Sequence, residues 1–117
     1  MSTLYSGNGT FLANTVVTAF RAVVLSSNGG ITLNTSATKP DGFALTDAAS
    51  GDYVSVKFFH NPGTQKGSLS AAPITIGDTV YAANAGNVSP TGTVVIGKSL
   101  TTSAVTGAVI EFIPNTL

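Results

Sequence analysis

The feature that most constrains the fold of this chain is an internal repeat. The segment GFALT at residues 42–46 resembles GKSLT at residues 97–101, which lies 55 residues further along (97 − 42). Each segment is followed by small residues, a glycine (Gly51 or Gly107) and an apolar stretch with the alternation of a β-strand. Self-similarity of this kind indicates that one supersecondary unit is used twice. The sequence therefore predicts two tandem copies of a single strand-and-turn unit.

The similarity extends upstream of these two segments. Residues 23–30, VVLSSNGG, resemble residues 79–86, TVYAANAG, at an offset of 56 (79 − 23). A deletion of one residue in the connecting loop reconciles the two offsets. We therefore expect one repeat over about residues 16–59 and the second over about residues 72–113.

The composition of both copies favours strands over helices. The apolar side chains of residues 16–24 have helical spacing, but the segment is rich in Val and Thr, whose branched Cβ atoms favour strands. The second copy has Gly77-Asp78 in the corresponding segment, and this pair would interrupt a helix. We therefore predict a strand over residues 20–26. Many short strands separated by turn residues predict an all-β fold, either a small β-barrel or a β-sandwich.

Residues 1–15 lie outside the two copies and form a predicted extended N-terminal arm, whereas residues 16–117 form the β-domain. The arm is rich in Gly, Asn, Ser and Thr. A polar terminal segment can remain disordered, whereas a segment with apolar anchors can become ordered on a partner. Both alternatives stay open at this point. The arm has four large apolar residues, which are the candidate contact residues: Leu4, Tyr5, Phe11 and Leu12.

The chain is poor in the residue types that catalysis and metal binding require. It has no cysteine and a single histidine, His60, so a Ser-His-Asp arrangement would depend on that residue alone. Several carboxylates stand beside glycines, where they usually accept backbone N–H bonds. The sequence also has no dense Asp-x-Asp loop for calcium. We therefore predict no enzyme activity, with no catalytic residue, no cofactor and no metal site. The acidic residues are Asp41, Asp47, Asp52, Asp78 and Glu111.

Charge is unusually low, because charged residues make up 9% of the chain and the formal net charge is zero. In ordinary soluble domains about a quarter of the residues are charged. Without a basic excess there is no electrostatic basis for binding nucleic acid or an anionic membrane. No apolar run approaches the ~20 residues that cross a bilayer, and residues 1–10 lack the pattern of a signal peptide. Since lone domains usually stay soluble through charge, this composition suits a subunit of an assembly.

Two further segments carry a resemblance to a known family. Together with the duplicated Gly-x-[Ala/Ser]-Leu-Thr element, IGDTVY at residues 76–81 and IGKSL at residues 96–100 resemble the capsid decoration, or cement, proteins of tailed bacteriophages. The resemblance covers about residues 16–113. The first copy departs from the pattern, since Arg21-Ala22 is aligned with the Gly-Asp pair of the second copy.

This resemblance implies a structural virion protein that is made in the cytoplasm of a host bacterium. It implies binding to the outer surface of an icosahedral phage head and stabilisation of the capsid. The implied partners are the major capsid protein and further copies of the chain, as a homotrimer first and otherwise as a dimer or monomer. The family pattern designates no catalytic residues. The apolar arm residues become candidate contacts to the capsid or to a neighbouring subunit.

The alternative function is a head-fibre or tail-associated binding module, with carbohydrate as one ligand class. Such a module would need an exposed aromatic or polar groove, because sugars stack on aromatic rings. The chain has no tryptophan. We favour packing in the core or an interface for the three tyrosines that could line such a groove, which are Tyr5, Tyr53 and Tyr81.

Overall fold

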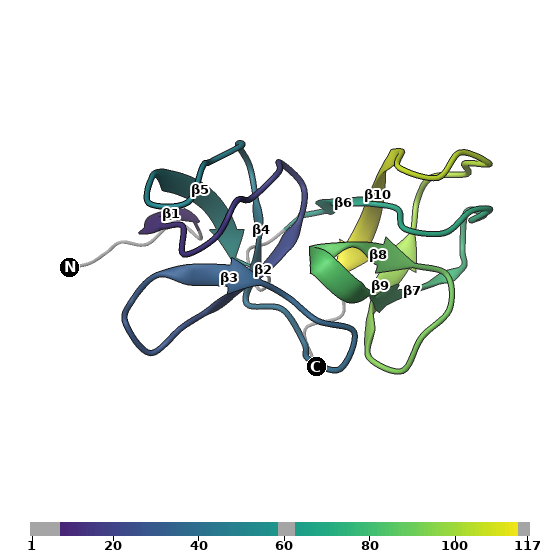
Figure 1. Ribbon diagram of the computed structural model, residues 1–117. Helices are drawn as coiled ribbons and strands as arrows, with labels where there is room; N and C mark the ends of the chain where they lie inside the picture. The colour runs from purple at the N-terminus through teal and green to yellow at the C-terminus, as the bar shows by residue number, and fades with distance from the viewer. Residues whose placement is uncertain (1–7, 59–62, 115–117) are drawn as a thin grey trace.

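The chain forms two five-stranded antiparallel sheets, one in each half of the sequence (Figure 1). The computed structural model describes residues 8–58, here called the first lobe, and residues 63–114, the second lobe. The strands of the first lobe are β1 (Asn8–Leu12), β2 (Ala22–Leu25), β3 (Ile31–Leu33), β4 (Gly42–Ala44) and β5 (Tyr53–Phe58). Those of the second lobe are β6 (Gln65–Ser68), β7 (Thr79–Ala82), β8 (Val88–Ser89), β9 (Val95–Ser99) and β10 (Val109–Pro114). A short 3₁₀ helix, η1 (Asn84–Gly86), precedes β8.

The two sheets have the same topology, so the predicted duplication and the all-β fold are confirmed. The first sheet has the order β1-β5-β4-β2-β3, and the second has the matching order β6-β10-β9-β7-β8. The isolated bridge between Val17 and Ala48 recurs in the second lobe between Ile74 and Ser103. The predicted strand over residues 20–26 is present as β2. Within the described ranges, no helix is long and apolar enough to cross a membrane.

The structure moves the alignment of the two copies by one residue in β2 and in the residues just before it. The N–H of Phe20 donates to the carbonyl oxygen of Ala44 at 2.8 Å, and the N–H of Gly77 donates to that of Ser99 at 2.9 Å. The residues that replace Gly77-Asp78 in the first copy are therefore Phe20-Arg21, where the sequence comparison had placed Arg21-Ala22. Alignment on the asparagine side chains produced this error, because the turn after β2 and the turn after β7 differ in conformation.

Residues 8–12 of the predicted arm form strand β1 of the first sheet. Strand β1 pairs with β5 in a register that runs from Asn8 opposite Lys57 to Leu12 opposite Tyr53. Ala13, which follows, is buried. Strand β1 is the counterpart of β6, a relation that sequence comparison misses because backbone pairing requires no side-chain similarity. Residues 1–7 lie outside the described residues.

Each lobe has its own hydrophobic core, and the second core continues into the first lobe. The first core contains side chains of the first lobe alone. The second core adds Ala22 and Phe43 from the first lobe to its own side chains. The rings of Phe43 and Phe112 meet edge to face, with centroids 5.4 Å apart at 67°. This shared core joins the two lobes.

The glycine of the repeated Gly-x-[Ala/Ser]-Leu-Thr element allows a close approach of strands. A Cβ atom at Gly42 would lie 2.6 Å from the carbonyl oxygen of Lys57. At the equivalent Gly97 it would lie 2.2 Å from the carbonyl oxygen of Ile113. Both distances are too short for a contact with a carbon atom. Glycine at these two positions therefore allows β4 to pair closely with β5, and β9 with β10.

Candidate contact surfaces

The lobes meet at a junction formed by β2 and β4 on one side and by η1 and β6 on the other (Figure 1). Across it, the N–H of Ser68 donates to the carbonyl oxygen of Phe20 at 3.0 Å. The guanidinium of Arg21 donates through Nη1 to the carbonyl oxygen of Ala85, also at 3.0 Å. A Cβ atom at Gly86 would lie 2.5 Å from the carbonyl oxygen of Ala22. These backbone contacts give the lobes a defined relative position.

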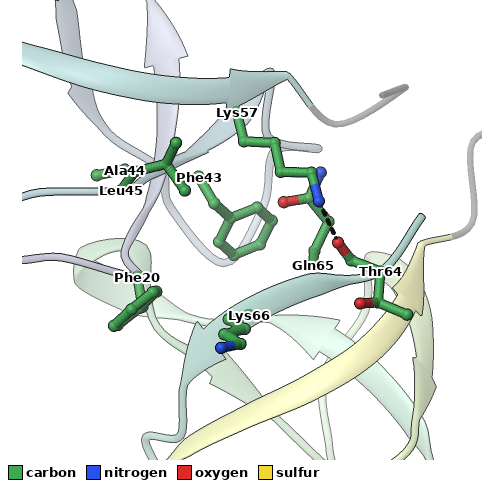
Figure 2. A pocket seen from close by; sticks show the side chains of 8 residues that line it. All are labelled: Phe20, Phe43, Ala44, Leu45, Lys57, Thr64, Gln65 and Lys66. Atoms are coloured by element: carbon green, nitrogen blue, oxygen red, sulfur yellow. Dashed lines mark hydrogen bonds between the residues drawn. The ribbon is translucent and has the colours of Figure 1, made fainter. Parts of the chain in front are cut away.

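A pocket of about 220 Å³ opens at this junction (Figure 2). Figure 2 shows the ring of Phe43 between the side chains of Lys57, from β5, and Lys66, from β6. The Nζ atom of Lys57 donates to the carbonyl oxygen of Thr64 at 2.5 Å. The sequence reasoning did not single out this group. We call it the junction pocket, and its lining residues are Phe20, Phe43, Ala44, Leu45, Lys57, Thr64, Gln65 and Lys66.

A second kind of surface lies at the starts of β5 and β10, where both lobes expose apolar side chains. Tyr53 begins β5 and is 71% exposed, and its counterpart Val109 begins β10 and is 46% exposed. Leu12 lies opposite Tyr53 in the sheet and Val16 lines the same hollow as Tyr53. Of the two locations predicted for Tyr53, the core of its own lobe is therefore excluded and an interface stays a prediction. We call these regions the strand-end surfaces, which contain Leu12, Val16 and Tyr53 in the first lobe and Val105 and Val109 in the second.

The four predicted contact residues of the arm are placed differently. Phe11 is half-buried, and its ring packs edge to face against Phe58 with centroids 5.7 Å apart. Leu12 is 37% exposed and belongs to the first strand-end surface. Leu4 and Tyr5 lie outside the described residues. Phe11 therefore holds β1 within its own lobe, and Leu12 is available for a contact.

Three carboxylates accept backbone N–H groups, a role that the sequence predicts for two of them, Asp41 and Asp78. Asp41 Oδ2 accepts the backbone N–H of Leu25 at 2.8 Å, and Asp47 Oδ1 accepts that of Ala19 at 2.7 Å. Asp78 accepts the N–H three residues before it in the same way. In the two described stretches of chain, no group of three or more His, Cys, Asp or Glu residues could hold a metal ion. His60 lies outside these stretches.

The duplicated sheets, the shared core and the apolar strand ends define a β-structural module whose distinctive features are its surfaces. The chain belongs to the phage cement protein family, whose model matches residues 6–113. Membership identifies a structural phage protein of capsid decoration and stabilisation, as the sequence resemblance implied. The match begins before β1, in agreement with the place of β1 in the first sheet.

A solved structure has the same fold. The chain is similar to the N base of head fibre gp8.5 in bacteriophage phi29, with a TM-score of 0.79 and 21% sequence identity. The similarity covers 92% of this chain and 92% of that one. At this identity the likeness shows the fold and carries no further conclusion about function. None of the curated proteins matches the chain.

Proposed function

We propose that this chain binds the outer surface of an icosahedral phage head, contacts the major capsid protein through the strand-end surfaces of both lobes, and performs no catalysis. The observation that carries the proposal is the exposure of Tyr53 and Val109 at equivalent positions of the two lobes. In a chain with only 9% charged residues, exposed apolar side chains are well suited to binding a partner. Membership of the cement protein family supports the capsid as that partner.

Two equivalent surfaces on one rigid chain suit a shell that presents many identical subunits. When the first lobe has bound one capsid subunit, binding of the second lobe to the neighbouring subunit becomes intramolecular. The effective concentration of the second lobe is then high, and the two weak contacts together hold the chain firmly. Apolar contacts are also insensitive to salt, in contrast to exposed ion pairs. A capsid bridged in this way resists separation of its subunits.

We also propose that the chain assembles with further copies of itself on the shell, as a homotrimer. An open groove of about 440 Å³ on β7, β9 and β10 supports self-association, because Val95 and Ile113 expose apolar surface there. Analytical ultracentrifugation of the free protein measures the assembly state. A monomer at all concentrations would contradict the homotrimer and leave the capsid contact to be tested separately.

The test of capsid binding uses purified phage heads that lack this protein. Burying a large apolar side chain contributes about 1.5–3 kcal/mol, so Tyr53→Ser and Val109→Ser should each weaken binding roughly tenfold or more. The double variant should bind more weakly still. Leu25→Ser is the matched control, because Leu25 is also an exposed apolar residue but lies outside both strand-end surfaces. Co-sedimentation with heads measures the bound fraction.

Wild-type binding by the double variant would contradict the proposed surfaces. Failure of the wild-type protein to bind heads, together with binding to glycans, would instead support a head-fibre or tail-associated module. The arm needs its own test, because β1 belongs to the fold. Deletion of residues 1–7 removes Leu4 and Tyr5 but leaves β1, so the domain should fold and bind heads less tightly. Unchanged binding would show that the arm is not a capsid contact.

A further inference from the structure

We propose that the junction pocket receives an apolar side chain, flanked by a carboxylate, from the capsid subunit on which the first lobe rests. This inference rests on the proposed function and adds the chemistry of the partner segment. One residue of the pocket has an unusual backbone conformation. Phe20 has φ of 68°, in the left-handed region, and lines the pocket. A left-handed conformation is strained for an L-residue, and glycine avoids this strain.

The second lobe shows what the fold alone requires at this position. Its counterpart of Phe20 is Gly77, with φ of 94°, and the same backbone hydrogen bond is made there. The turn therefore needs a left-handed residue, and glycine meets that need without strain. The first lobe has a phenylalanine at a site where it destabilises the turn. Strain of this kind is concentrated at binding sites, and here its product is an aromatic wall of the pocket.

The charges around the pocket point to an anionic group on the partner. Two of the five basic residues of the chain, Lys57 and Lys66, lie on either side of the Phe43 ring (Figure 2). Lys57 donates to a carbonyl oxygen, and neither lysine forms an ion pair within the described part of the chain. Glu111 of β10 lies opposite Lys66 of β6 in the strand register, and its carboxylate accepts a hydrogen bond from the Thr64 hydroxyl. The pocket thus combines an apolar wall with a cationic rim in a chain of zero net charge.

Size and position select the occupant. A cavity of ~150 Å³ accepts one benzene molecule, so about 220 Å³ has room for one leucine or phenylalanine side chain. The side chains of Tyr53 and Lys57 project from the same face of β5, because alternate residues of a strand share a face. The pocket and the first strand-end surface therefore lie on one sheet face. A capsid segment that reaches Tyr53 can place an apolar residue in the pocket and its acidic neighbour at the lysines.

The test measures binding of variants to purified heads that lack this protein, at low and high salt. Phe20→Gly removes the aromatic wall and restores the residue type of the second lobe, so it should keep the fold and weaken binding about tenfold. Phe20→Asn repeats the test with a residue that also tolerates positive φ. Lys66→Gln should weaken binding severalfold at low salt and reduce its salt dependence. The matched control is Lys39→Gln, a lysine that lines neither the junction pocket nor the groove on β7, β9 and β10, which should bind as the wild type.

Each outcome bears on the inference separately from the proposed function. If Phe20→Gly and Phe20→Asn bind heads like the wild type while Tyr53→Ser binds weakly, the pocket is not a capsid contact and the proposed function stands. If the Phe20 variants change the assembly state of the free protein and leave head binding unchanged, the occupant is a second copy of the chain. Either result would overturn the inference. Equal losses of binding for Lys66→Gln and Lys39→Gln would overturn the proposed contact between Lys66 and a carboxylate of the capsid.

Discussion

The left-handed conformation of Phe20 predicts that glycine is more stabilising than alanine at position 20, the reverse of the usual order in a folded chain. In both substitutions the half-buried ring is lost, which costs about 1 kcal/mol if half of a full burial of ~1.5–3 kcal/mol is removed. Phe20→Ala keeps the strain of φ at 68°. Phe20→Gly relieves about 1–2 kcal/mol of strain and loses about 0.5–1 kcal/mol to the flexibility of glycine in the unfolded chain.

The free energy of unfolding of Phe20→Gly should therefore exceed that of Phe20→Ala by about 0.5–1 kcal/mol, and it should be close to that of the wild type. For a chain of this size the difference corresponds to roughly 2–4 °C in Tm. Urea unfolding followed by circular dichroism measures the free energies, and differential scanning calorimetry measures Tm.

The matched control is Val24, a half-buried residue in β2 without positive φ. There Val24→Ala should be more stable than Val24→Gly, by about 0.5–1 kcal/mol. Greater stability of alanine at both positions would refute the reasoning, because it would mean that residue 20 is not held in the left-handed region. Greater stability of glycine at both positions would also refute it, because the order at position 20 would then not depend on the left-handed conformation.

Three further predictions concern stability. Gly97→Ala should lower the free energy of unfolding by several kcal/mol or prevent folding, because the added Cβ would meet the carbonyl oxygen of Ile113 at 2.2 Å. A loss below ~1 kcal/mol in urea unfolding would contradict this prediction. Phe43→Ala should lower the free energy of unfolding by about 3–5 kcal/mol, since its ring is buried against Phe112. Calorimetry of the wild type should show one transition for both lobes, and two separate transitions would contradict the shared core. Asp41→Ala should cost about 1 kcal/mol, because its carboxylate accepts a backbone N–H at the end of β2; unchanged urea unfolding would show that water replaces it.

Much of the fold could be predicted because the duplicated residues are the ones that the backbone needs. Gly42 and Gly97 stand where strands approach closely, and Gly51 and Gly107 have φ of 93° and 90° in equivalent turns. Such positions are constrained in the same way in both copies, so they produce visible sequence similarity. Strand β1 has no such constraint and was therefore assigned to the arm.

The junction pocket could not be predicted from the sequence, because it depends on positions where the copies differ. Phe20 corresponds to Gly77, and the alignment by sequence was displaced by one residue at that point. The pocket also draws residues from both lobes, and no pattern within one repeat indicates how two repeats pack. The strand-end surfaces were missed for a simpler reason: an exposed Tyr53 has the same sequence pattern as a buried one.

One difference between the copies lies where the first lobe packs on the second, and it has a physical explanation. Phe43 of β4, which is buried in the junction, corresponds to Lys98 of β9, which is exposed. A tandem repeat needs an apolar residue where one copy packs on the other, and it accepts a polar residue where the same face is exposed. Lys98 accordingly lines the open groove beside Val95 and Ile113, whereas Phe43 is covered by the second lobe. The same position of the repeat thus serves packing between the lobes in one copy and an exposed surface in the other.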